Sequence, residues 1–327
     1  MKRLSILVTL LLLMISSASA DSNLPGVNDF IAEMVTKHHF DKNELTALFD
    51  HVEVKDSILK AIARPAEKSK PWYDYRKIFI TDKRINGGVL FWNKHQKALA
   101  EAEKQYGVPA EIIIAILGVE TRYGGNIGHY RVIDALSTLA FRYPPRSKFF
   151  RSELENFLIL THEEKISELE PVGSYAGAMG LGQFMPSSYL SYAVDFDHDG
   201  HRDIWNNPVD AIGSIANYLN RHGWVAGESI VHKTTIMGQD PISLTDKGYK
   251  PTLTRDNLRA AGVSLTYLPK GIDRLALISL TQQNGEEYWI TQHNFYVITR
   301  YNHSRMYAMA VNQLANEIRT HYEQAIK

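Results

Sequence analysis

The chain has no cysteine among its 327 residues. This absence excludes disulfide bonds and catalysis by a thiol. Attachment of a lipid to an exported bacterial precursor requires a cysteine at the cleavage site, so we expect no lipid anchor here. The framework of the folded protein must therefore come from packing and hydrogen bonds.

An excess of charge of either sign is also missing, because Lys and Arg together number 36 and so do Asp and Glu. Loss of residues 1–20, which include Lys2 and Arg3, leaves a net charge of −2. Bulk binding to nucleic acid relies on many cationic contacts to phosphate, so this balance argues against a nucleic-acid partner. A chain of this length can bury a large core and usually holds two or more subdomains.

A long apolar run occurs only at the start of the chain. Lys2 and Arg3 precede an apolar stretch at 4–15, and Ala18-Ser19-Ala20 forms a small-residue cleavage site. This pattern is typical of a secretory signal peptide. A membrane anchor is the alternative, but the stretch is shorter than the ~20 residues that span a bilayer. We expect cleavage after Ala20 and a periplasmic protein without a transmembrane segment in the mature chain.

Apolar spacing and turn signals predict a mainly α protein of the α+β class. Residues 226–293 differ from the rest, since they hold short runs of β-branched and aromatic residues and indicate a small β-rich subdomain with one helix at 254–261. The expected parts are a signal peptide (1–20), an N-terminal helical region (21–70), a core (71–225), the β-rich subdomain (226–293) and a C-terminal part of the core (294–327). The expected helices cover 25–63, 90–106, 109–123, 131–141, 147–160, 186–193, 208–221 and 304–325, with a linker at 64–70.

One carboxylate stands out on the helix predicted over 109–123. Ile113, Ile116, Leu117 and Glu120 share one face, so Glu120 ends a stripe that is otherwise apolar. Burial raises the pKa of a carboxyl group, and an acid that keeps its proton near neutral pH is what a general acid needs. A structural ion pair with Arg122 or Arg131, or a helix cap at the surface, would explain the pattern equally well.

A second unusual stretch is the glycine-rich segment at 173–186, which reads GSYAGAMGLGQFMP. Small residues let the backbone approach a ligand or another helix closely. The segment lacks the lysine of a P-loop and the third glycine of a dinucleotide site, so phosphate binding is not indicated. Close helix packing is the alternative to a ligand site.

An acidic loop at 195–206 reads DFDHDGHRDIWN and follows the calcium-binding loop of an EF-hand. Asn206 replaces the usual bidentate Glu at position 12, which we expect to weaken binding. Oxygen ligands favour calcium over zinc, although an acidic solvated turn remains the alternative. The predicted metal ligands are Asp195, Asp197, Asp199, His201 (through its carbonyl) and Asp203, around a turn at Gly200.

Taken together, VETRYG at 119–124, the segment at 173–186, WYDYR at 72–76 and FYVITRYN at 295–302 resemble the lytic murein transglycosylase B family. The resemblance covers nearly all of the mature chain. It implies a lysozyme-like helical core, the calcium loop and no organic cofactor. It also implies that Glu120 is the catalytic residue. The best-known member is a lipoprotein, and this chain departs from it because the cysteine is missing.

The same resemblance implies a substrate and a set of residues that contact it. The family cleaves the β-1,4 bond between N-acetylmuramic acid and N-acetylglucosamine in peptidoglycan and leaves a 1,6-anhydro ring. By resemblance, the glycan strand lies against polar and aromatic side chains, and the tyrosines offer flat faces to sugar rings. Taken alone, each tyrosine would be interpreted as a core residue. The positions are Tyr75, Arg146, Ser174, Gln183, Phe184, Tyr218, Tyr301, Asn302 and Tyr307.

One carboxylate suffices for this reaction, whereas most glycosidases use two. Glu120 would protonate the leaving oxygen and then accept the proton of the sugar's own C6 hydroxyl as that oxygen attacks C1. The alternatives are a hydrolytic muramidase on the same fold and a non-catalytic, calcium-dependent peptidoglycan-binding scaffold. We expect peptidoglycan strands as the partner and a monomeric protein, and the sequence names no protein partner.

Overall fold

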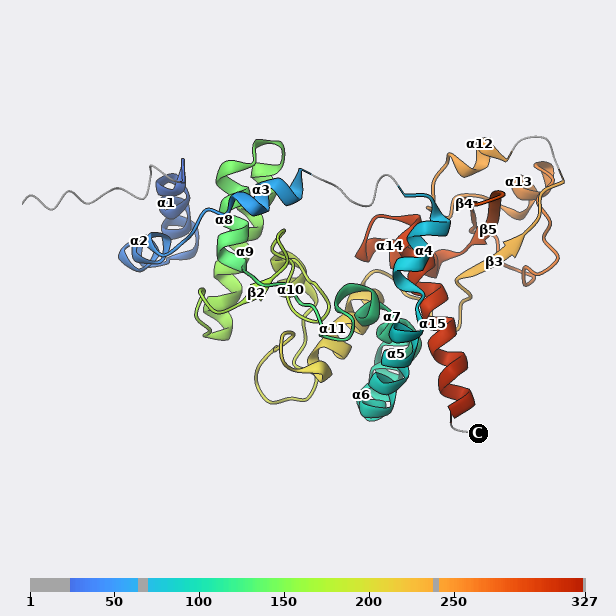
Figure 1. Cartoon of the computed structure of the whole chain (residues 1–327), viewed down its shortest axis with the longest axis horizontal. Coiled ribbons are helices and arrows are strands. Elements are labelled where there is room, and N and C mark those ends of the chain that lie inside the picture. The colour runs from blue at the N-terminus through green and yellow to red at the C-terminus, as the bar shows by residue number, and fades with distance from the viewer. Residues whose placement is uncertain (1–23, 64–69, 238–240, 326–327) are drawn as a thin grey trace, which may run out of the picture.

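The computed structural model describes residues 24–63, 70–237 and 241–325. Helices make up most of the described chain, and a small β-rich part lies at one end (Figure 1). Within these ranges, no helix has both the length and the apolar character that a membrane span needs. The predicted signal peptide, residues 1–20, and most of the predicted linker lie outside the described residues.

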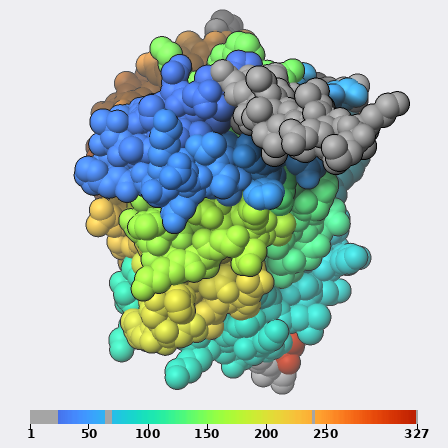
Figure 2. Space-filling view, turned by 90° about the vertical axis from the view of Figure 1, so that its left-hand side faces the viewer, coloured from blue at the N-terminus to red at the C-terminus, as the bar shows by residue number. Residues whose placement is uncertain are grey.

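The N-terminal region forms three short helices, as predicted for 25–63: α1 (Val27–His38), α2 (Lys42–Asp50) and α3 (Asp56–Ile62). Its aromatic side chains pack on the core, since Phe30 and Phe49 lie 5.9 and 6.5 Å from Phe141, measured between ring centroids. The buried Asp134 carboxylate accepts the backbone N–H of Glu53 at 2.9 Å. Figure 2 shows this region in blue, lying over the green part of the core.

The next helices surround the one that carries Glu120. They are α4 (Trp72–Phe79), α5 (Asp82–Lys94) and α6 (Gln96–Tyr106), followed by α7 (Ala110–Thr121). The predicted single helix at 90–106 is wrong, because α5 begins at Asp82 and the chain breaks at His95. Thr81 caps α5 by accepting the N–H of Arg84 at 3.3 Å. No glycine or proline marks the break at His95, so the sequence carried no signal for it.

The glycine-rich stretch lies among four further helices that match their predicted positions: α8 (Val132–Arg142), α9 (Ser147–Glu164), α10 (Pro186–Tyr192) and α11 (Pro208–Arg221). A short 3₁₀ turn, η2 (Pro144–Arg146), links α8 to α9. A two-stranded sheet joins β1 (Tyr130–Arg131) to β2 (Val172–Gly173). This pairing brings the start of the glycine-rich stretch beside the chain that follows α7.

The predicted β-rich subdomain is present as a three-stranded antiparallel sheet in the order β3-β5-β4. The strands are β3 (Val231–Thr234), β4 (Ala276–Gln282) and β5 (Gly285–Thr291), with short helices α12 (Ile242–Thr245) and α13 (Arg255–Ala260) beside them. One face of the sheet, with Ile278 and Leu280, joins the main core. Leu277 and Ile290 on the other face form a separate small core.

Two helices close the chain: α14 (His293–Tyr301) and α15 (Arg305–Ala325). The position of α15 was predicted, but α14 was not. Its aromatic and β-branched residues favour strands, and no side chain caps its first turn. Burial of Phe295 and Ile298 stabilises the helix instead. The last helix, α15, packs on both α4 and α7 and therefore contacts the helix that carries Glu120.

Candidate active site and acidic loop

Glu120 lies in the last turn of α7, and it is half-buried while every other residue of that helix is buried. The other faces of the helix are thus buried in addition to the predicted apolar stripe. The helix is enclosed on all sides, because α5, α6, α11 and α15 all contact it. A carboxylate at the one position that reaches the surface is positioned by a rigid, fully packed element.

The chain turns sharply directly after Glu120. Arg122 and Tyr123 both adopt left-handed backbone conformations, with φ of 54° and 61°. Such angles are uncommon for residues other than glycine and mark a constrained turn. The predicted end at 123 is therefore two residues too late, because Thr121 is the last helical residue.

Thr121 connects this turn to the glycine-rich stretch. Its buried hydroxyl donates to the Leu181 carbonyl at 2.9 Å, and it accepts the N–H of Gly124 at 3.0 Å. A hydroxyl that both donates and accepts in a buried site fixes two backbone segments at once. The end of α7 is thereby held against the glycine-rich stretch at Leu181.

Arg84 supports the same helix from behind. Its Nε donates to the Gly118 carbonyl of α7 at 2.8 Å, and its Nη1 donates to the carbonyls of Ile78 and Phe79 at the end of α4. The side chain is buried, and burial lowers the pKa of Arg84. A guanidinium at two helix C-termini satisfies carbonyls that have no partner in the helix. No pattern in the sequence indicates this role.

The hydroxyl of Tyr307 donates a 2.6 Å hydrogen bond to Oε1 of Glu120. Tyr307 lies in the first turn of α15 and is buried. Burial and the nearby Glu120 carboxylate raise the pKa of Tyr307 well above the ordinary value, so the phenol keeps its proton and remains a donor. This contact joins two of the segments that were predicted to form the site.

A row of aromatic rings leads away from this pair. Tyr301 lies parallel to Tyr307 with ring centroids 6.5 Å apart, and Tyr218 meets Tyr301 edge to face at 4.8 Å. Phe184 touches both Tyr218 and Tyr301, at 5.7 and 5.9 Å. Because Tyr75, Tyr218 and Tyr307 are buried, they do not present the open faces that we expected for sugar stacking.

The hydroxyl of Tyr301 holds the glycine-rich stretch by donating to the Gly182 carbonyl at 2.5 Å. A Cβ at Gly182 would come within 2.9 Å of that hydroxyl, so the close approach requires glycine. Burial, and secondarily the Glu120 charge, raise the pKa of Tyr301. The end of α7, the glycine-rich stretch and the turn at the start of α15 therefore meet near Glu120 through Tyr307, Tyr301 and Thr121.

Ser174 and Gln183 shape the glycine-rich stretch itself. The hydroxyl oxygen of Ser174 accepts the backbone N–H groups of Ala176 and Ala178, at 3.3 and 3.1 Å. Gln183 has a left-handed backbone, and its side-chain amide donates to the carbonyls of Ile127 and Gly180, at 3.1 and 2.9 Å. Both side chains fix the backbone that faces Glu120, and substrate contact by either stays a prediction.

The remaining predicted residues lie at different distances from this centre. Tyr75 is buried on α4 and close enough to Tyr307 for its charge to act on that phenol. Asn302 follows Tyr301 in the turn that leads to Tyr307. Arg146 is exposed on η2 and packs over the Phe149 ring at 4.3 Å. Within the described residues, Arg146 does not contact Glu120, Tyr301 or Tyr307.

The acidic loop and the first turn of α11 bring three carboxylates together, with ligand atoms within 4.8 Å of one another: Asp195, Asp197 and Asp210. Asp210 is fully buried, and burial raises its pKa to about 6, with the charges of Asp197 and Asp195 adding to the effect. Its two oxygens accept the N–H groups of Phe196 and Asp203, both at 2.8 Å. Crowded carboxylate oxygens of this kind fit a hard divalent cation.

The sequence prediction of the metal ligands differs from this cluster. Asp195 and Asp197 belong to both sets, whereas Asp210 was missed. Asp199 instead accepts the N–H of His201 at 2.9 Å, and Asp203 accepts those of Trp205 and Asn206. Asp210 is the next acid in the chain after Asp203, so Asn206 at position 12 was the signal for a longer loop. Asp199, His201 and Asp203 stay predicted ligands.

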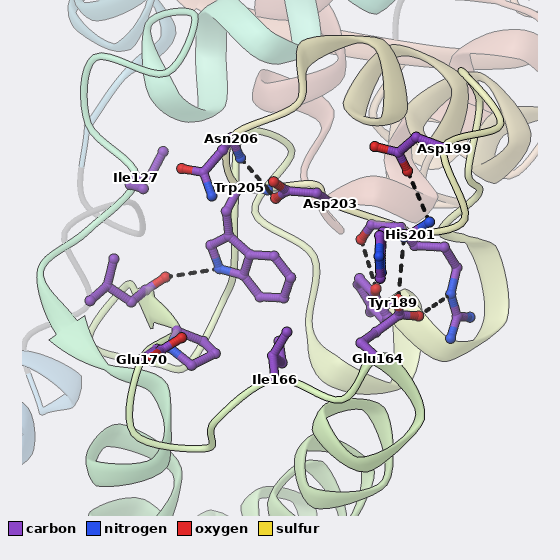
Figure 3. Close-up of a pocket in the computed structure, with 13 residues that line it drawn as sticks. Ile127, Glu164, Ile166, Glu170, Tyr189, Asp199, His201, Asp203, Trp205 and Asn206 are labelled. Carbon is purple, nitrogen blue, oxygen red and sulfur yellow. Dashed lines mark hydrogen bonds and ion pairs between the residues drawn. The ribbon is translucent and has the colours of Figure 1, made fainter.

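A cavity of about 390 Å³ lies between this loop and the chain before β1 (Figure 3). Trp205 forms part of its wall and donates its indole N–H to the Val172 carbonyl at 3.2 Å. Ile127 lies on the opposite side, and its carbonyl accepts the Gln183 side chain. The loop therefore packs against the backbone that supports the glycine-rich stretch.

Comparison with known proteins shows which family has this architecture. The transglycosylase SLT domain matches residues 22–316. The membrane-bound lytic murein transglycosylase B of Escherichia coli (strain K12) is 43% identical over 306 residues, which cover 91% of this chain and 83% of that protein. The soluble lytic transglycosylase SltB1 from Pseudomonas aeruginosa superposes with a TM-score of 0.86 at 54% identity, covering 90% of this chain and 98% of that one.

A third relative concerns the acidic loop. The Escherichia coli lytic transglycosylase Slt35, solved in complex with calcium, superposes with a TM-score of 0.84 at 43% identity. The match covers 92% of this chain and 95% of that one. The predicted mainly helical, lysozyme-like class of fold is confirmed by these matches, while the predicted domain boundaries stay predictions.

Proposed function

The chain belongs to the transglycosylase SLT domain family, and from this premise we propose that it cleaves murein strands without water, with Glu120 as the single acid and base. The reaction is that of a lytic murein transglycosylase, and the bond cut is the β-1,4 bond between N-acetylmuramic acid and N-acetylglucosamine. The product is a 1,6-anhydromuramyl end.

The observation that carries this proposal is the hydrogen bond from Tyr307 to Glu120. It fixes a half-exposed carboxylate at the end of a helix that is otherwise buried. The charge of Glu120 raises the pKa of both Tyr301 and Tyr307, which places its carboxylate close to both phenols. A site with one carboxylate supports chemistry in which the substrate supplies the nucleophile, since a second carboxylate is the usual requirement for hydrolysis.

Glu120 alone can carry out both proton transfers of the reaction. Protonated Glu120 gives its proton to the glycosidic oxygen as the bond from that oxygen to C1 breaks. The C6 hydroxyl oxygen of the muramyl residue then attacks C1, and the Glu120 carboxylate takes the hydroxyl proton. Glu120 ends protonated, as it began. No water enters the product, and Tyr307 keeps the carboxyl group oriented through both transfers.

The substrate strand is proposed to lie along the residues that converge on Glu120. Gln183 and Ser174 hold the backbone of the glycine-rich stretch, and the buried tyrosines hold its distance from α7. Asn302 is the predicted polar contact to the sugar, and Arg146 is the predicted contact to a stem-peptide carboxylate. We place this activity in the periplasm, where the substrate is.

Calcium is proposed to bind at the acidic loop as a structural ion. Slt35 of Escherichia coli was solved with calcium, and three crowded carboxylates, one of them fully buried, fit such an ion here. The ion would neutralise the mutual repulsion of Asp195, Asp197 and Asp210. Arg202 already anchors the loop to α9 through Glu164, at 2.5 Å.

Product analysis on purified peptidoglycan tests the proposed reaction. We expect mass spectra dominated by fragments with anhydromuramyl ends. Reducing ends that carry an added water would instead establish a hydrolytic muramidase on this fold. Binding of peptidoglycan without any release of soluble fragments would leave only a calcium-dependent scaffold.

A further inference from the structure

A second cavity, of about 770 Å³, lies where the helical core meets the small sheet. Its volume falls in the range of ~300–1,000 Å³ that is usual for ligand pockets, which often form between structural units. The turn at 302–306 forms one wall, and Tyr249 and Thr281 of the β-rich subdomain form another. Trp72, at the start of α4, lies between them. Figure 1 shows the subdomain beside α4 and α14.

The backbone turn that lines this cavity connects directly to residues of the candidate active site. The turn at 302–306 runs from Tyr301, which is bonded to Gly182, to Tyr307, which is bonded to Glu120. Asn302 is a predicted glycan contact and lines the cavity. Its side-chain amide forms no hydrogen bond with any other described residue. The turn that lines this cavity therefore also sets the positions of the two tyrosines beside Glu120.

Trp72 contributes a buried polar group to the wall of the cavity. The side chain is 1% exposed, and its indole N–H has no hydrogen-bond partner within the described residues. Buried donors are normally paired, because leaving one unpaired is costly. An indole can only donate, so the group that would pair with it is a hydrogen-bond acceptor.

The remaining lining suits a glycan that carries acidic peptides. Lys70, Arg305 and Asp246 give the lining a net positive charge of one. Tyr249 is half-buried, with its ring 6.4 Å from that of Tyr296. An aromatic ring with a polar hydroxyl, beside the Asn302 amide, can pack against a sugar ring and form hydrogen bonds with its hydroxyls.

We propose that this cavity binds the sugar units of the strand that lie beyond those at Glu120, so that the β-rich subdomain supplies outer glycan subsites. The proposal rests on the proposed function for the identity of the strand. Its direct consequence is a dependence on chain length. Short glycans fill only the residues around Glu120, whereas longer ones also gain the contacts at Tyr249 and Trp72.

The test compares turnover of purified tetrasaccharide and octasaccharide murein fragments. We expect Tyr249→Ala to lower kcat/KM for the octasaccharide about tenfold, the effect of one lost aromatic contact, and to leave the tetrasaccharide value unchanged. Thr281→Trp places a bulky ring in the cavity from an exposed position on β4, and it should have the same selective effect. If Tyr249→Ala fails to fold, the Thr281→Trp variant tests the proposal instead.

Tyr267→Ala is the matched control, because Tyr267 is 79% exposed in the same subdomain and does not line the cavity. Equal loss for both substrates in Tyr249→Ala and Thr281→Trp, or no loss for either, overturns the proposal. Failure of the wild type to form anhydromuramyl ends from the tetrasaccharide would instead overturn the proposed function, whatever the length dependence.

Discussion

The phenol of Tyr307 donates a 2.6 Å hydrogen bond to the carboxylate of Glu120, although 187 residues separate the two in the chain. The bond joins the end of α7 to the start of α15. It holds the only residue of α7 that is not buried. The orientation of the proposed acid and base therefore depends on a contact between distant parts of the sequence.

Removal of this hydroxyl should reduce activity more than stability. We expect Tyr307→Phe to lower kcat about ten- to hundredfold, which corresponds to one hydrogen bond to a charged group, ~1.5–3 kcal/mol. Steady-state kinetics on murein fragments measure this. Tyr322→Phe, on the same helix, removes a hydroxyl bonded to Gln96 and should leave kcat unchanged. Equal activity of Tyr307→Phe and wild type would contradict the assigned role.

Arg84→Met should lower both stability and kcat. The substitution leaves the Gly118 carbonyl of α7 without its 2.8 Å partner, at a cost of ~1–3 kcal/mol for a buried unpaired group. Urea unfolding measures the first effect and turnover the second. Arg274→Met, at an exposed arginine, is the control. A loss of stability with full kcat would show that Arg84 does not position Glu120.

Calcium should raise the melting temperature, and chelation should reverse the rise. Asp210→Asn is expected to abolish the shift, because the buried carboxylate is one of three that crowd the loop. Thermal unfolding with calcium or with a chelator measures this. Asp256→Asn, at an exposed acid on α13, should retain the full shift. A melting temperature that ignores calcium in the wild type would leave only the acidic-turn interpretation.

Stability should fall in alkaline solution because of the buried tyrosines. Burial raises the folded-state pKa of Tyr218, Tyr301 and Tyr307 above the unfolded value near 10. Their contribution to the free energy of unfolding is therefore complete below about pH 10. It is lost as the pH rises further, at up to ~1.4 kcal/mol per pH unit for each tyrosine.

Unfolding in urea above pH 10 measures how steeply the free energy of unfolding falls with pH. Tyr218→Phe should reduce this slope, whereas Tyr267→Phe, at a residue 79% exposed, should not. A slope that is the same in Tyr218→Phe and wild type would mean that Tyr218 ionises as readily in the folded protein as in the unfolded chain.

The helices with clear boundary signals could be predicted from the sequence. Pro208 begins α11, whose Asn207 cap and following Gly223 are local signals, and the predicted range 208–221 is the observed one. The break at His95 and the helix α14 could not be predicted. Neither has a local signal, and packing against the core decides both.

The residues of the site were predictable only in part. Glu120 and the tyrosines follow from motifs, but the burial of Tyr218 and Tyr307 depends on how α11, α14 and α15 pack. Asp210 was missed because the loop pattern ends at Asn206. Arg84 was missed because its acceptors are backbone carbonyls on two helices, which leave no trace in the sequence.

The most direct test of the central claim is the rate at which Glu120→Gln releases anhydromuramyl products from peptidoglycan. The amide keeps the shape of the side chain and can still accept from Tyr307, but it can neither give nor take the reacting proton. We predict a loss of about a thousandfold or more, the contribution of general acid–base catalysis. Release of the same products at a rate within tenfold of wild type would contradict the account.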